Sequence, residues 1–130
     1  MAKIYKLNKF IDNRGFLLKV VENAFIGRAM FGELYMISFK NKQIRGNHYH
    51  KKTTEWFVVI KGNLRLILQH SRTKKKEVIL LSSDDPRCVR IDPLIAHSLE
   101  PVDGRQTLML AYSSKKYNAL SPDTYKYVVK

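Results

Sequence analysis

The sequence has little cysteine, no long apolar run and few helix- or chain-breaking residues. Its 130 residues include one cysteine, Cys88, so no disulfide can form within the chain and a reducing compartment is indicated. No apolar segment reaches the roughly 20 residues that span a bilayer, and the first ten residues carry three lysines. We therefore expect a cytoplasmic protein with no membrane segment and no cleaved leader. With 45% hydrophobic residues, 4 Pro and 6 Gly, the composition excludes disorder.

Acidic residues are also scarce relative to basic ones. Lys and Arg number 24 against 11 Asp and Glu, which gives a formal net charge of +13 and makes nucleic acid the first partner to consider. The cations are spread over residues 1–90, however, and the densest run, at 72–76, lies between two apolar segments as a solvated hairpin tip would. No nucleic-acid-binding motif accompanies them. We expect a basic surface without a nucleic-acid partner. A nucleotide diphosphate remains a compatible ligand, because two or three well-placed cations are enough to bind it.

Short apolar segments recur along the chain at regular intervals. They cover residues 16–21, 34–39, 55–60, 64–69, 78–81, 88–91 and 107–112. Clusters of Gly, Asn, Asp and Pro separate them, and no long window has a helical period. This pattern predicts an all-β barrel or sandwich, with one domain over residues 1–130 and a mostly irregular tail from residue 115.

Two histidines lie two positions apart on one predicted strand. His48 and His50 therefore project from the same face and can reach one ion or one substrate together. The polar connection at 51–54 would let Glu55 open the next antiparallel strand beside them. Alternation then places Glu55 on the inner face, where a buried carboxylate needs a partner. Trp56 falls on the outer face, where we expect it to cover a dimer interface.

A further histidine, His97, follows a late strand that would close near the same place. Three histidines and one glutamate form a nitrogen-rich ligand set for a divalent metal: His48, His50, Glu55 and His97. Zinc is the first choice, and nickel, iron or manganese also suit these ligands. An ion that tolerates more than four ligands would keep positions open for water or substrate. We expect His70, beside the 71–76 turn, to be structural.

The spacing of these residues resembles a known sequence motif. His48, His50, Glu55 and Gly62 match the first cupin motif, and His97 takes the place of the histidine in the second. The resemblance implies a cupin double-stranded β-helix, which is a jelly-roll-like antiparallel barrel with its site at the mouth.

Within the cupins, the chain resembles enzymes that act on sugar nucleotides. Residues 12–16 and the run from Arg45 to His48 resemble motifs of dTDP-4-dehydrorhamnose 3,5-epimerases. Residues 46–59 and 117–125 most closely resemble the C-terminal metal-binding cupin domain of capsular polysaccharide biosynthesis enzymes. The resemblance implies a homodimeric isomerase or epimerase of a nucleotide-diphosphate-linked 4-keto-6-deoxy sugar, active in polysaccharide or deoxysugar biosynthesis. It also implies that Arg14, Arg45 and Asn47 bind the substrate.

The identity of the proton-transferring group depends on the metal. In such enzymes the 4-keto group acidifies the neighbouring hydrogen, a base removes it, and the resulting oxyanion must be stabilised. A histidine nitrogen bound to metal has no free lone pair, so His48 is the base if the site is metal-free. If His48 is a ligand, Tyr117 or Tyr112 takes that role. Two other activities suit the same residues, namely a metal-dependent cupin dioxygenase and a non-catalytic sugar-binding module.

Overall fold

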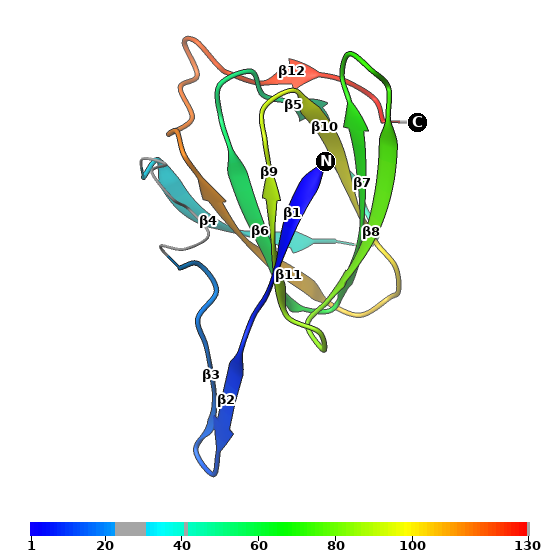
Figure 1. Ribbon diagram of the computed structural model, residues 1–130. Coiled ribbons are helices and arrows are strands. Elements are labelled where there is room, and N and C mark those ends of the chain that lie inside the picture. The colour runs from blue at the N-terminus through cyan, green and yellow to red at the C-terminus, as the bar shows by residue number, and fades with distance from the viewer. Residues whose placement is uncertain (23–30, 41, 130) are drawn as a thin grey trace.

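The protein folds as an array of β-strands, seen in the computed structural model in Figure 1, which describes residues 1–22, 31–40 and 42–129. The strands are β1 (Ala2–Lys6), β2 (Lys9–Asp12), β3 (Gly15–Leu18), β4 (Glu33–Phe39), β5 (Arg45–Tyr49), β6 (Glu55–Lys61), β7 (Asn63–His70), β8 (Lys76–Ser82), β9 (Arg87–Ile91), β10 (Ile95–Pro101), β11 (Thr107–Ser113) and β12 (Tyr125–Lys126). These ranges contain no helix, so the predicted all-β class is confirmed. Accordingly, the described chain has no helical stretch long and apolar enough to cross a membrane.

Two five-stranded antiparallel sheets make up the body of the molecule. One has the strand order β1-β9-β6-β11-β4 and the other β12-β5-β10-β7-β8. A separate hairpin of β2 and β3 extends away from both sheets in Figure 1. The two-sheet arrangement agrees with the cupin-like β fold that the sequence motif implied.

The main hydrophobic core is formed by the inward faces of the strands. Leu64, Leu66 and Leu68 alternate along β7 and are all completely buried, as the sequence pattern predicts. On β6, Phe57 and Val59 join the same cluster. The inner face of β6 therefore begins with Glu55 and continues with apolar side chains, which places the carboxylate at one end of the core.

A second apolar cluster lies on the other face of β6. Trp56 packs there with Val58, Cys88 and Tyr112, and Leu7 from the N-terminal segment is buried against them. Trp56 is 1% exposed, so the prediction that it covers a dimer interface is wrong: the chain's own N-terminal segment covers it. Burial raises the pKa of the Cys88 thiol to about 12, which keeps it protonated and unreactive.

A glycine allows β5 and β10 to approach each other closely beside the site. Gly46 has φ of +95°, and a Cβ at this position would lie 2.6 Å from the carbonyl oxygen of His97. The register between the two strands shifts between His97 and Ser98, directly opposite this glycine. Because no side chain intervenes at residue 46, His48 and His97 can form a cross-strand pair.

Candidate functional site

The four predicted ligands come together at one end of the two sheets. His48 lies on β5 opposite His97 on β10, His50 follows the end of β5, and Glu55 is the first residue of β6. One nitrogen or oxygen from each residue lies within 4.8 Å of those of the others. We call His48, His50, Glu55 and His97 the His/Glu cluster. Its assembly from three strands follows the sequence prediction.

Glu55 connects the members of the cluster. Its Oε1 lies 2.9 Å from Nε2 of His50 and 3.5 Å from Nε2 of His97, while its Oε2 accepts a hydrogen bond of 3.0 Å from the Tyr35 hydroxyl. Burial acts to raise the pKa of Glu55, but His50, His97 and Tyr35 outweigh it and hold that pKa below its usual range. The buried carboxylate is therefore ionised.

Tyr35 on β4 is a member of the site that sequence reasoning missed. Burial, followed by the negative charge of Glu55, raises the pKa of Tyr35, so its hydroxyl stays protonated and remains a donor. In β4, exposed and less exposed residues alternate, and Tyr35 belongs to the inward-facing set with Ile37. The sequence does not show this period, because two of the exposed residues, Leu34 and Met36, are apolar as well. The sequence offers no sign that its hydroxyl meets Glu55.

His50 is held by the backbone of the C-terminal segment, residues 114–126. Its Nδ1 lies 2.5 Å from the carbonyl oxygen of Asp123, and because a carbonyl can only accept, Nδ1 carries the proton. When the ring is protonated, Nε2 can donate to Oε1 of Glu55 at 2.9 Å, and when the ring is neutral, Nε2 has a lone pair that a metal ion could accept. Burial acts to lower the pKa of His50, but the hydrogen bond and charge of Glu55 outweigh it and the pKa is raised.

His48 differs from the other two imidazoles of the cluster because, within the described residues, it forms no ion pair with Glu55. Its pKa is lowered to about 4 by burial and by the neighbouring His97 and His50, so the ring is neutral at pH 7. The ion pairs of Glu55 within the described chain go to His50 and His97. His48 therefore lines the pocket as a neutral imidazole beside a carboxylate that is already engaged.

The cluster fits a divalent metal ion. Three imidazoles and one carboxylate are the donors that zinc, nickel, iron and manganese accept. Ligand atoms about 2.0–2.1 Å from a tetrahedral zinc ion lie roughly 3.4 Å apart, so the four atoms, which lie within 4.8 Å of one another, would have to draw closer together around an ion. Within the described residues, His50 Nε2 and Glu55 Oε1 are buried atoms without an aligned hydrogen bond, as expected of atoms that face a shared ligand.

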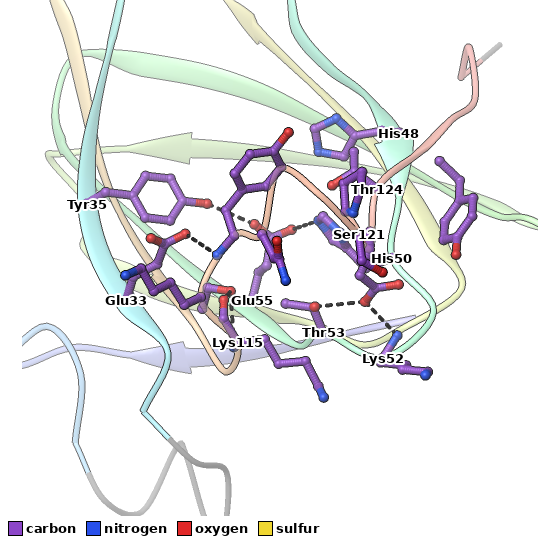
Figure 2. A pocket seen from close by; sticks show the side chains of 17 residues that line it. Glu33, Tyr35, His48, His50, Lys52, Thr53, Glu55, Lys115, Ser121 and Thr124 are labelled. Carbon is purple, nitrogen blue, oxygen red and sulfur yellow. Dashed lines mark hydrogen bonds and ion pairs between the residues drawn. The ribbon is translucent and has the colours of Figure 1, made fainter.

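A pocket of about 580 Å³ opens beside the cluster, and Figure 2 shows its lining. Its walls come from β4, from the connection between β5 and β6, from the end of β11 and from the C-terminal segment. Tyr117 is among the lining residues, as predicted, and its backbone N–H donates to Glu33 Oε1 at 3.2 Å. The volume is in the range of small-ligand sites.

Tyr112, which was also predicted as a site residue, is not part of the lining of this pocket. Its ring packs against Trp56 in the second cluster, with ring centroids 5.2 Å apart, on the face of the sheet opposite Glu55. Ser113, the next residue of β11, lines the pocket instead. Neighbouring residues in a strand point to opposite faces, so a shift of one position reverses the assignment.

The predicted substrate-binding residues also lie away from the pocket lining. Arg14 sits at the tip of the β2–β3 hairpin and pairs with Asp12 at 2.6 Å. Arg45 donates from Nε to the carbonyl oxygen of Ser38. The Asn47 side chain accepts a hydrogen bond from the backbone N–H of Val129 and so anchors the end of the chain. Binding of substrate by these three residues stays a prediction.

Comparisons with known proteins agree with this geometry. Residues 10–125 match the family described as the polysaccharide biosynthesis C-terminal domain. The TDP-4-oxo-6-deoxy-alpha-D-glucose-3,4-oxoisomerase of Aneurinibacillus thermoaerophilus is 25% identical over 98% of this chain and 93% of its own length.

Two solved structures have the same fold. The 3,4-ketoisomerase QdtA from Thermoanaerobacterium thermosaccharolyticum, solved as a mutant in complex with TDP-4-keto-6-deoxyglucose, has a TM-score of 0.81 at 20% identity, covering 96% of this chain and 86% of that one. The capsular polysaccharide assembling protein CapF from Staphylococcus aureus has a TM-score of 0.74 at 23% identity over 96% of this chain. This chain spans about a third of CapF, 33%. With the family match over most of its length, the chain belongs to the polysaccharide biosynthesis C-terminal domain family, and its relatives include a TDP-sugar 3,4-oxoisomerase.

Proposed function

We propose that the protein is an isomerase or epimerase of a nucleotide-linked 4-keto-6-deoxy sugar, which moves a proton beside the ketone. The observation that carries the proposal is the neutral imidazole of His48, which lines a pocket of about 580 Å³ beside the ionised carboxylate of Glu55. The oxoisomerase that is 25% identical over nearly the whole chain supports the same reaction class.

His48 is the proposed base. The 4-keto group acidifies the hydrogen on the adjacent carbon, and the neutral ring accepts that proton. The lowered pKa of His48 keeps the ring unprotonated at pH 7, and once protonated the imidazolium can return the proton to the other face or to the neighbouring carbon. Tyr117, on the pocket wall, is the proposed second proton donor.

We propose that His50, Glu55 and His97 hold a divalent metal ion, with zinc as the first choice. Such an ion would stabilise the enolate oxygen as a Lewis acid. Glu55 already contacts both histidines, whereas His48 must keep a free nitrogen if it is to act as the base. The assignment therefore separates metal ligation and proton transfer between different residues of the cluster.

Hydrogen exchange into the sugar tests this proposal. The purified protein is incubated with TDP-4-keto-6-deoxyglucose in heavy water, and the sugar is analysed by NMR and mass spectrometry. We expect deuterium at a carbon flanking the ketone. The His48→Asn variant should exchange about 10² to 10⁴ times more slowly, the range contributed by one general base, and should retain its bound metal.

The matched control is His70→Asn, because His70 caps the 71–76 turn outside the pocket. It should exchange deuterium at the native rate. Absence of deuterium with the native protein would sink the proposed activity. Loss of metal in His48→Asn would show instead that His48 is a ligand and that the base is another residue.

We also propose that the protein is a homodimer. Both faces of the β2–β3 hairpin carry an exposed apolar cross-strand pair, Phe10 with Leu17 and Ile11 with Phe16. A two-stranded hairpin is marginally stable by itself in water, and exposed apolar surface of this kind is typical of an interface. A second copy of the chain would cover these side chains.

A further inference from the structure

Three lysines lie on the lining of the pocket: Lys52, Lys115 and Lys116. All three are exposed, and no salt bridge or side-chain hydrogen bond within the described residues engages their ammonium groups. Figure 2 labels Lys52 and Lys115 at the same side of the pocket, below Glu55 in that view. The pocket thus carries positive charge without a described partner.

The acidic groups of the pocket are occupied by other donors. Asp123 accepts from the backbone N–H groups of Lys51 and Lys52 at 2.9 and 2.8 Å and from the Thr53 hydroxyl at 2.8 Å. Glu33 accepts from the backbone of Tyr117. With the carboxylate of Glu55 committed to its histidines and tyrosine, the three lysines remain available to an incoming anion.

The backbones that carry two of these lysines are fixed in place. Lys52 donates its N–H to the Asp123 carboxylate, as described above. At Lys115, the carbonyl oxygen accepts from the Ser113 hydroxyl at 2.8 Å, and Gly32 packs so closely that a Cβ there would lie 2.3 Å from the Lys115 backbone. Because the main chain at these two lysines is already fixed, binding of an anion by their ammonium groups costs less conformational entropy.

We propose that Lys52 and Lys115, with Lys116 beside them, bind the diphosphate of a nucleotide-linked ligand. The inference rests on the proposed function for the choice of a diphosphate, and it assigns to these lysines the role that the sequence resemblance gave to Arg14 and Arg45. Lysine ammonium groups bind phosphate through charge-assisted hydrogen bonds. The arrangement orients the sugar end of the ligand toward the His/Glu cluster in the same pocket.

Binding of nucleoside diphosphates tests the inference without any turnover. TDP, UDP and thymidine are titrated into the native protein and into Lys52→Ala, Lys115→Ala and the double variant by calorimetry. We expect the double variant to bind the diphosphate at least about tenfold more weakly, a difference of roughly 1.4 kcal/mol. Thymidine, which has no phosphate, should bind all four proteins equally. A Lys52→Arg, Lys115→Arg variant, which keeps both charges, should bind the diphosphate nearly as the native protein does.

The matched control is Lys75→Ala, at the tip of the β7–β8 hairpin and outside the pocket lining. It should leave the dissociation constant unchanged. Equal diphosphate affinity in the native and double-variant proteins would overturn the inference, as would a native protein that binds neither TDP nor UDP. The proposed function fails separately: if the lysine variants lose affinity but no deuterium enters the sugar, the diphosphate site stands and the isomerase proposal falls.

Discussion

At the scale of single residues, Glu55 is the contact point of the candidate site. Its carboxylate receives Tyr35 from β4, His50 from the end of β5 and His97 from β10. Burying a charged carboxylate costs free energy unless charged or hydrogen-bonding partners offset that cost, so the ionisation of Glu55 depends on these neighbours. Each contact comes from a different element, so the full set of Glu55 contacts forms only when all of these elements are in their native positions.

The first prediction concerns the Glu55→Gln variant. Glutamine keeps the shape of the side chain, and its amide oxygen can still accept from Tyr35, but it removes the negative charge from the proposed metal site. We expect zinc affinity to fall at least about 100-fold, the upper end of what losing an outer-shell partner costs. Competition against a chromophoric chelator measures this affinity.

A surface glutamate gives the control for that measurement. Glu100→Gln removes a carboxylate that pairs with Arg65 at 3.4 Å on the outside of the molecule, so zinc affinity should not change. Circular dichroism should show the same β-sheet spectrum for both variants. Unchanged zinc affinity in Glu55→Gln would remove Glu55 from the proposed ligand set.

At the scale of elements, Asp123 joins the C-terminal segment to the site through both its side chain and its carbonyl oxygen. Asp123 binds the connection between β5 and β6 with its carboxylate and meets His50 with its backbone oxygen. The segment otherwise has little regular structure, since β12 comprises two residues paired with β5. Asp123 is therefore expected to determine whether this wall of the pocket stays closed.

The second prediction is that Asp123→Ala loosens the wall. Burial acts to raise the pKa of Asp123, but the hydrogen bonds from Lys51, Thr53 and Lys52 outweigh it and the pKa is lowered. A lowered carboxyl pKa stabilises the fold above the unfolded value, and that stability is lost as pH falls through the folded value. We expect the variant to lose about 1–3 kcal/mol of unfolding free energy at pH 7. The difference from the native protein should shrink below pH 3.8, the ordinary Asp value.

Urea denaturation at pH 7 and pH 3 measures both effects, and hydrogen exchange reports the Lys51 and Lys52 amides directly. Those two amides should exchange faster in the variant. Asp92→Ala removes a surface carboxylate paired with Arg90, and should cost less than about 1 kcal/mol. An Asp123→Ala protein with native exchange rates at these amides would contradict the anchoring role.

The same elements show how far sequence reasoning reaches. The alternating faces of β7 were predictable, because this strand buries one face in the core and a period of two in its sequence matches that burial. Both faces of β6 are buried, so its inner face was predicted from the position of Glu55. Strands β1, β2 and β12 were missed, because β1 is at most half-buried at any position and every residue of β2 and β12 is exposed. Strands like these bury little of either face, so no period of two marks them in the sequence.

The candidate site divides in the same way. The His/Glu cluster was predictable because most of it lies within eight residues, where strand and turn geometry fix the directions of the side chains. Asp123 and Lys115 reach the pocket from a part of the chain with no period, so nothing in their spacing pointed there. Arg45 lies outside the pocket lining, and Gly46 and Asn47 after it both have positive φ, which interrupts the regular alternation of side chains between Arg45 and His48.

At the scale of the whole molecule, the β2–β3 hairpin is the part that the described chain leaves most exposed. It projects from the two sheets in Figure 1, and Ile11 and Phe16 are 75% and 65% exposed. The edge strand β4 adds Leu34 and Met36, which are also exposed. A chain with a net charge of +13 repels its copies, so apolar surface has to provide the attraction in a dimer.

The third prediction is that charges on the hairpin dissociate the proposed dimer. Sedimentation of the native protein should give twice the chain mass of 15.2 kDa. Phe10→Asp with Leu17→Asp places two carboxylates on one face of the hairpin, where they would be buried on association, and should give the single-chain mass. Both side chains are exposed within one chain, so the melting temperature of each chain's own core should change little.

Leu80→Asp, on the edge strand β8 and 62% exposed, is the matched control and should remain dimeric. A native protein that sediments as one chain at all concentrations would refute the dimer, and a dimer that survives the hairpin charges would place its interface elsewhere.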